Sequence, residues 1–164
     1  MSSERSATTS TRSKARKRAL DILFEAELRG SDVLDTLHER TADADPPVRD
    51  YTKVLVEGVH AHASDIDGRI SDSLAQGWSL PRTPRVDRNT LRIAVFEIDY
   101  SDLPDAVAAS EAVHLVSELS TDESPAFVNG VLGALIAKKN DSEAQPAVTS
   151  SAATDPAATD PAEV

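Results

Sequence analysis

The sequence feature that constrains the fold most is the helical spacing of apolar side chains, which is clearest within residues 85–100. Leu91, Ala94, Val95 and Ile98 follow one another at i, i+3, i+4 and i+7, so they share one face of an α-helix. Further apolar residues widen that face: Ile93, Phe96 and Tyr100. A helix that is apolar around so much of its circumference needs neighbours on several sides, and we expect it at the centre of the fold.

The same period recurs in other segments and predicts an all-α fold class with about seven helices. The first helix should run from about Arg12 to Arg29 and stop at Gly30, and Ser31 or Asp32 can cap the second. The composition agrees, because the chain has only one Trp, two Tyr and three Phe. Sparse aromatics with abundant Ala, Leu and Val favour packed helices over a β-sandwich or barrel.

Local signals also place two later helix boundaries. The third helix should begin near Pro46 or Pro47, with Asp45 as its cap, because proline suits the first turn of a helix. The last helix should end at Lys138 and Lys139, since cations in a last turn suit the helix dipole.

Two kinds of residue are expected to serve packing rather than function. Trp78 should pack the connection that contains it against the core. Gly130 and Gly133 lie inside a helix, where each glycine costs about 1 kcal/mol relative to alanine. We expect the close approach of another helix to compensate for that cost.

The two ends of the chain differ in composition from its middle. Residues 1–11 are rich in Ser and Thr, and the segment from Asn140 onward repeats Ala-Ala-Thr-Asp-Pro twice. Neither end has enough large apolar side chains to offset the entropy of ordering. We therefore expect a disordered N-terminal tail over 1–11, one helical domain over 12–139, and an acidic disordered tail over 140–164.

A short basic segment near the N-terminus contrasts with the acidity of the whole chain. Six Lys or Arg and no acidic residue lie between Arg5 and Arg18, although the formal net charge is -11. Cations at a helix N-terminus oppose the helix dipole by roughly 0.3–1 kcal/mol each, and a polyanionic partner would remove that conflict. The segment indicates nucleic-acid binding, and the alternative is a solvated basic tail.

The sequence offers no set of residues for catalysis or for metal binding. There is no Cys, and His60 and His62 are two residues apart, so on a helix they point about 200° apart and cannot share a metal ion. No nucleophile elbow or nucleotide-binding motif occurs. We expect no enzyme activity and no cofactor. No apolar run approaches the ~20 residues of a membrane span, so we expect a cytoplasmic protein without membrane contact.

Three segments in order resemble the bacterial transcription antitermination factor family NusB. They are residues 14–20 (Lys-Ala-Arg-Lys-Arg-Ala-Leu), residues 91–98 (Leu-Arg-Ile-Ala-Val-Phe-Glu-Ile) and residues 124–132 (Ser-Pro-Ala-Phe-Val-Asn-Gly-Val-Leu). The third is the most specific, and Val107–Val113 occupies the family's helix between the last two. The resemblance covers about residues 12–139.

The resemblance implies two packed three-helix bundles and binding to the boxA element of nascent ribosomal RNA transcripts. It also implies NusE, a small-subunit ribosomal protein, as the usual partner within the RNA polymerase antitermination complex. The expected function is to promote read-through by RNA polymerase and to support rRNA maturation. Whether the chain forms a homodimer stays open.

The family's functional residues can be carried over to positions in this sequence. Its arginine-rich RNA-binding motif falls on Arg12, Lys14, Arg16, Lys17 and Arg18, whereas Ser13 stands where the family often has another Arg. The resemblance also points to two aromatic residues near the RNA and one residue facing NusE: Phe24, Phe127 and Glu123. For each aromatic residue, core packing is the alternative to base stacking.

Two rival functions remain to be compared with RNA binding. A domain of this kind also occurs ahead of an rRNA cytosine methyltransferase, but that architecture needs a downstream catalytic domain, and we expect none in a chain of 164 residues. The second rival is a protein-interaction adaptor in which the acidic helices bind partners and the basic segment is incidental. RNA binding measured without any protein partner separates the adaptor from the RNA-binding protein.

Overall fold

The structure is a computed structural model that describes the backbone of residues 2–145 and the side chains of residues 11–145. All regular secondary structure in this part of the chain is helical, as predicted. The elements are α1 (Ser2–Arg29), α2 (Val33–Ala42), α3 (Asp50–Ala61), α4 (Ala63–Ser71), the 3-10 turn η1 (Leu80–Arg82), α5 (Arg85–Tyr100), α6 (Asp105–Leu119) and α7 (Ser124–Ala144).

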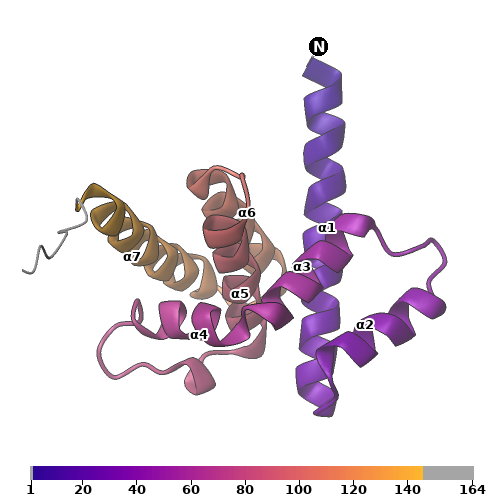
Figure 1. Ribbon diagram of the computed structural model, residues 1–164, viewed down its shortest axis with the longest axis horizontal. Helices are drawn as coiled ribbons and strands as arrows, with labels where there is room; N and C mark the ends of the chain where they lie inside the picture. Colours follow the sequence, from indigo (N-terminus) through magenta and orange to yellow (C-terminus); the bar gives the residue numbers. More distant parts are fainter. Residues whose placement is uncertain (1, 146–164) are drawn as a thin grey trace, which may run out of the picture.

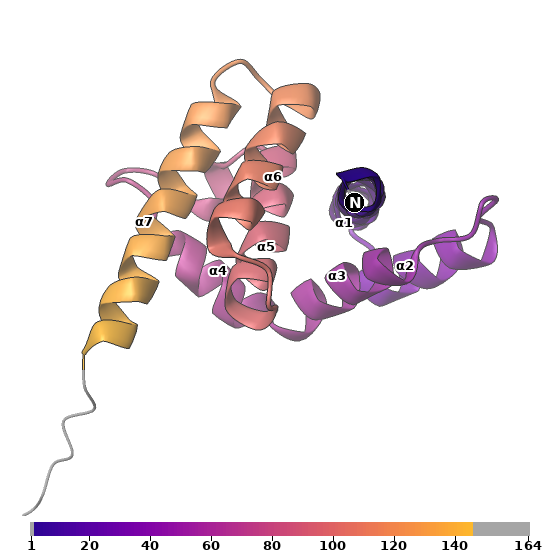
Figure 2. The same cartoon turned by 90° about the horizontal axis from the view of Figure 1, so that it is seen from above.

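The helices form two bundles that share an interface, which confirms the predicted architecture (Figures 1 and 2). Helices α1, α2 and α3 contact one another, while α5 packs with α6 and α7 and carries α4 along another side. Both α1 and α3 also pack on α5, so one apolar core runs through the two bundles.

Helix α5 is the central element, as its apolar circumference predicted. Every residue from Asp87 to Ile98 except Arg92 is buried. The contact with α3 is especially close at Gly58, because a Cβ built there would lie 2.2 Å from a ring carbon of Phe96. Glycine at this position therefore lets the two bundles approach each other.

The first turn between helices follows the predicted local signals. Gly30 adopts φ 65°, the left-handed conformation that commonly ends a helix. The Asp32 carboxylate accepts hydrogen bonds from the backbone N–H groups of Leu34 and Asp35, at 2.8 and 3.0 Å. This cap fixes the start of α2.

Three predicted helix boundaries are wrong. Helix α1 begins at Ser2 rather than near Arg12, because residues 2–11 contain neither glycine nor proline to break it. Helix α3 begins at Asp50, after a loop that buries Val48, and its cap residue Arg49 makes no capping side-chain bond. Helix α7 continues past Lys139 to Ala144, two residues before Pro146. Residues 146–164 of the predicted C-terminal tail lie outside the described residues.

Two packing predictions are also wrong. The side chain of Trp78 is 56% exposed, so it does not anchor its loop in the core. A Cβ added at Gly130 or Gly133 would have no other group within 4 Å, so neither glycine allows a helix to approach. Both glycines lie on the exposed side of α7.

Candidate nucleic-acid interface

Helix α1 presents its basic segment on two different faces. Ala15 and Ala19 are fully buried against the other helices, and Arg16 lies on the same inner side with 2% exposure. The other cations of the segment are accessible: Arg12, Lys14 and Lys17 are exposed, and Arg18 is half-buried. The helical rotation of 100° per residue separates Lys14, Lys17 and Arg18 from the buried Arg16, whereas Arg12 lies one turn before Arg16 on the same side and is exposed.

Arg16 is bound inside the protein by carboxylates of α5 and α6. Its Nε and Nη2 atoms each lie 2.8 Å from a carboxylate oxygen of Glu97, which makes a two-pronged hydrogen-bonded ion pair. Glu111 lies 3.5 Å from Nη1, and the Tyr51 hydroxyl donates to Glu97. Arg16 was predicted to contact RNA, but in the structure its guanidinium is already engaged and buried.

Tyr51 extends this network towards the surface of α3. Burial, followed by the hydrogen bond to Glu97, raises the pKa of the Tyr51 hydroxyl to about 12. Its ring also lies under two guanidinium groups, 4.9 Å from that of Arg12 and 5.7 Å from that of Arg16. The exposed Arg12 is thus held on an aromatic face while its N–H donors stay accessible.

The cations on the outer face of α1 form no close ion pairs with described residues. No ion pair joins Lys14, Lys17 or Arg18 to any residue whose side chain is described. Elsewhere cations are neutralised locally, as in Arg69 with Asp99 at 3.0 Å and Arg92 with Asp67 at 2.7 Å. Unpaired cations on an acidic protein form a natural surface for an external anion.

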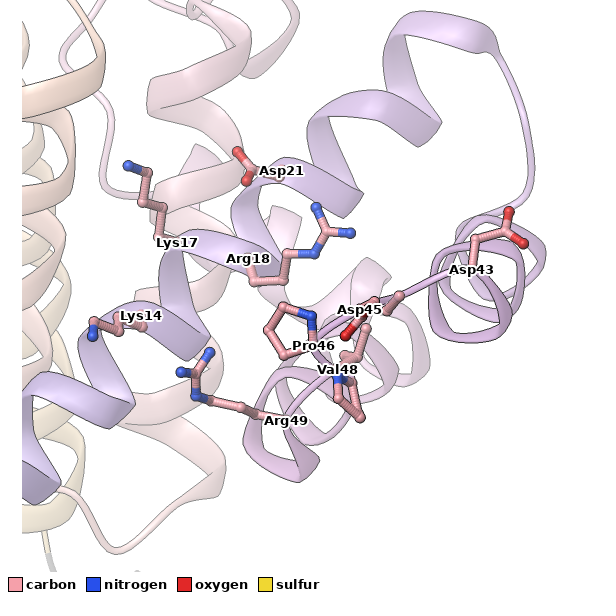
Figure 3. A pocket seen from close by; sticks show the side chains of 11 residues that line it. Lys14, Lys17, Arg18, Asp21, Asp43, Asp45, Pro46, Val48 and Arg49 are labelled. Carbon is pink, nitrogen blue, oxygen red and sulfur yellow. The ribbon is translucent and has the colours of Figure 1, made fainter.

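A hollow of about 520 Å³ opens beside these cations (Figure 3). One side is α1, which contributes Lys14, Lys17, Arg18 and Asp21, and the other is the loop of residues 43–49. Asp21 faces two of these cations, but burial outweighs their effect and raises the pKa of its carboxyl group. The sequence did not single out Arg49, which also lines the hollow.

The two predicted aromatic residues lie in different surroundings. Phe24 is half-buried on α1, and it is absent from the described core cluster and from the apolar residues packed against it. Phe127 is half-buried on α7, packs against the core, and has its ring 5.8 Å from that of Trp78 at 44°. The ring contact of Phe127 is thus with the loop before η1 and not with α1.

Glu123 lies at the turn between α6 and α7, where it is exposed. The next residue, Ser124, is buried and donates a hydrogen bond of 2.8 Å to Asp87 of α5. The Glu123 carbonyl accepts the N–H of Phe127 at 3.2 Å, so the backbone of the turn is fixed while the carboxylate stays outside. Its contact with a partner protein stays a prediction.

Neither a metal centre nor a membrane-spanning helix occurs in the part of the chain that the structure describes. No group of three or more His, Cys, Asp or Glu side chains there could hold a metal ion. No described helix is both long enough and apolar enough to cross a bilayer.

The chain matches proteins of known family along most of its length. The NusB family model matches residues 13–137. Transcription antitermination protein NusB of Nocardioides sp. is 53% identical over 131 residues, which cover 79% of this chain and 96% of the relative. The same protein of Acidothermus cellulolyticus is 54% identical over 136 residues, which cover 82% and 93%.

Solved structures agree with the sequence relatives. NusB of T. maritima superimposes with a TM-score of 0.69 at 30% identity, covering 80% of this chain and 96% of that one. A crystal structure of antitermination factors NusB and NusE in complex with dsRNA gives a TM-score of 0.68 at 30% identity, covering 77% and 96%. Together with the family model, these matches show that the chain belongs to the NusB family of transcription antitermination proteins.

Proposed function

We propose that this protein binds the boxA element of nascent ribosomal RNA transcripts and so promotes read-through by RNA polymerase and rRNA maturation. The observation that carries this proposal is the cluster of unpaired cations on the outer face of α1, on a chain whose net charge is -11. Such a cluster supplies phosphate contacts, which dominate the affinity of proteins for nucleic acids. The protein acts by binding rather than by catalysis.

The residues of the basic segment have two roles in RNA binding: some contact the RNA, and one positions α1. Arg12, Lys14, Lys17 and Arg18 contact phosphates, whereas the buried Arg16 fixes the angle of α1 through Glu97. We further propose that Phe24 and Phe127 stack on bases. Base stacking adds sequence preference to a surface that otherwise reads only phosphate.

Partner proteins follow from the family rather than from this chain's geometry. A NusB relative forms a complex with NusE and RNA, and we propose that this chain also binds NusE, with Glu123 in the contact. The resulting assembly would act on RNA polymerase in the cytoplasm, where transcripts are made. Light scattering of the chain with and without NusE tests the heterodimer and, in the same measurement, a homodimer.

A salt titration tests RNA binding by the outer face of α1. Four phosphate contacts on a single strand predict a slope of about -3 in log K against log salt, or roughly fifty-fold weaker binding between ~50 and ~200 mM salt. In Lys14→Ala with Arg18→Ala, the slope should flatten by about 1.4 because two contacts are lost. Fluorescence titration with boxA RNA, with and without NusE, measures both quantities.

The matched control removes the same charge elsewhere. Arg82 and Arg85 are exposed and form no ion pair with a described residue, so Arg82→Ala with Arg85→Ala should bind RNA like the parent. Equal salt slopes in the parent and in the α1 variant would contradict the proposed site and favour the protein-interaction adaptor.

A further inference from the structure

We propose that Arg49 is part of the RNA-binding surface and that it and Lys14 together hold one backbone phosphate in the hollow beside α1. This inference rests on the proposed RNA-binding function and adds a second segment of the chain to it. The hollow lies between α1 and the loop of residues 43–49, so an RNA strand seated there would be held from two sides.

The packing of α3 on α1 determines where Arg49 lies. The buried hydroxyl of Thr52 donates a hydrogen bond of 3.0 Å to the carbonyl of Ala15, which fixes the first turn of α3 against the basic segment. Val48 is buried at 8% exposure and holds the end of the loop. Arg49 lies between these two anchors, and Figure 3 shows its side chain pointing from the loop towards α1.

The charges around the hollow favour a phosphate near Arg49. Arg49 is exposed and, like Lys14 and Arg18, forms no ion pair with any residue whose side chain is described. It also precedes α3 without capping it, so the positive end of a helix of 12 residues adjoins the same place. Backbone N–H groups at such an end are donors without helical partners, and they favour anions.

The acidic residues of the hollow limit where a phosphate can bind in it. Asp43 and Asp45 belong to the loop, whereas Asp21 is on α1 together with Lys17 and Arg18, which it faces. In Figure 3, Asp43 lies at the opposite end of the hollow from Lys14. A phosphate is repelled from the acidic end and held at the end where Lys14 and Arg49 lie, and this end is the proposed seat of the phosphate.

Substitution of Arg49 tests the seat. At ~150 mM salt, Arg49→Ala should bind boxA RNA about fourfold more weakly, and its salt slope should be flatter by about 0.7. Arg49→Lys should keep most of the slope, because it keeps the charge. Arg82→Ala is the control with the same loss of charge outside the hollow, and unchanged circular dichroism and melting confirm that each variant folds.

A neutral linkage in the RNA locates the shared phosphate. In a series of boxA RNAs that each carry one methylphosphonate linkage, one position should weaken binding of the parent and hardly affect Arg49→Ala. In the Lys14→Ala background, Arg49→Ala should cost less than fourfold, because both side chains hold the same phosphate.

The possible failures are distinguishable. If Arg49→Ala binds like the parent while Lys14→Ala with Arg18→Ala is weakened, the seat is wrong and the RNA site on α1 stands. If neither variant differs from the parent in affinity or slope, the proposed function on α1 fails as well. A methylphosphonate series that affects the parent and Arg49→Ala alike would also overturn the shared seat.

Discussion

The inner and outer faces of α1 carry the same residue type with opposite consequences. On the inner face, Arg16 is buried and paired with Glu97, at the junction of the two bundles. On the outer face, Lys14 and Arg18 form no close ion pair with any residue whose side chain is described, and they line an open hollow. A cation at the junction holds the fold together, whereas a cation two residues away is available to a ligand.

The comparison shows that a basic motif in sequence is not a uniform surface in space. A buried ion pair stabilises little relative to an apolar pair, but removal of one partner leaves a charge without compensation in the interior. An exposed, unpaired cation contributes little to folding. Substitutions within this one segment should therefore separate stability from RNA affinity.

Arg16→Ala tests this separation with the largest expected effect. It leaves Glu97, which is 1% exposed, without its partner, and should lower the free energy of unfolding by about 3–5 kcal/mol. Lys14→Ala, the matched control on the outer face, should change it by less than about 0.5 kcal/mol. Urea unfolding followed by circular dichroism measures both.

A paired substitution sharpens the result for Arg16. Arg16→Met with Glu97→Leu replaces both charges with apolar groups and should recover most of the stability lost in Arg16→Ala. If Arg16→Ala unfolds like the parent but loses RNA affinity, Arg16 belongs with the outer face and the contrast between the faces is wrong.

Gly58→Ala tests the steric closeness of the same junction. The added Cβ would overlap the ring of Phe96, so we expect a loss of about 1–3 kcal/mol in unfolding free energy. Gly130→Ala is the matched control in a helix with open space, and it should gain up to about 1 kcal/mol. Equal effects of the two substitutions would show that α3 and α5 do not approach as closely as described.

Tyr51→Phe should have the smallest effect on the free energy of unfolding, and this effect should depend on pH. The pKa of Tyr51 is raised by burial and by Glu97 to about 12 in the folded protein, above the ordinary value of 10.0. The hydroxyl therefore contributes stability below pH 10 that is lost as pH rises towards 12. The difference in unfolding free energy between the parent and Tyr51→Phe should shrink over that range, and a constant difference would argue against the network.

The sequence predicted the all-α fold class correctly. The helix boundaries were predicted correctly only where local residues alone determine them. Helical periodicity identified the central α5, and Gly30 and Asp32 marked a turn by their own backbone chemistry. Pro46 and Pro47 misplaced the start of α3, because the burial of Val48 prolongs the loop. Such tertiary contacts leave no pattern in a single sequence.

The candidate site was predictable only in part for a similar reason. Arg16 lies four residues before Leu20 and seven before Leu23, so helical spacing could have placed it on the buried face. Its partner Glu97 is 81 residues away and carried no such signal. Arg49 is one arginine in a loop, and only the packing of Thr52 on α1 brings it beside the basic segment.

The long span between Arg16 and Glu97 has a consequence for synthesis on the ribosome. The ribosome makes the chain from its N-terminus at roughly 5–20 residues per second, and domains fold as they emerge. The basic segment emerges early, but the carboxylate that fixes Arg16 is made 81 residues later, and Glu111 later still. The ion pairs that hold Arg16 can therefore form only after α5 and then α6 have left the exit tunnel.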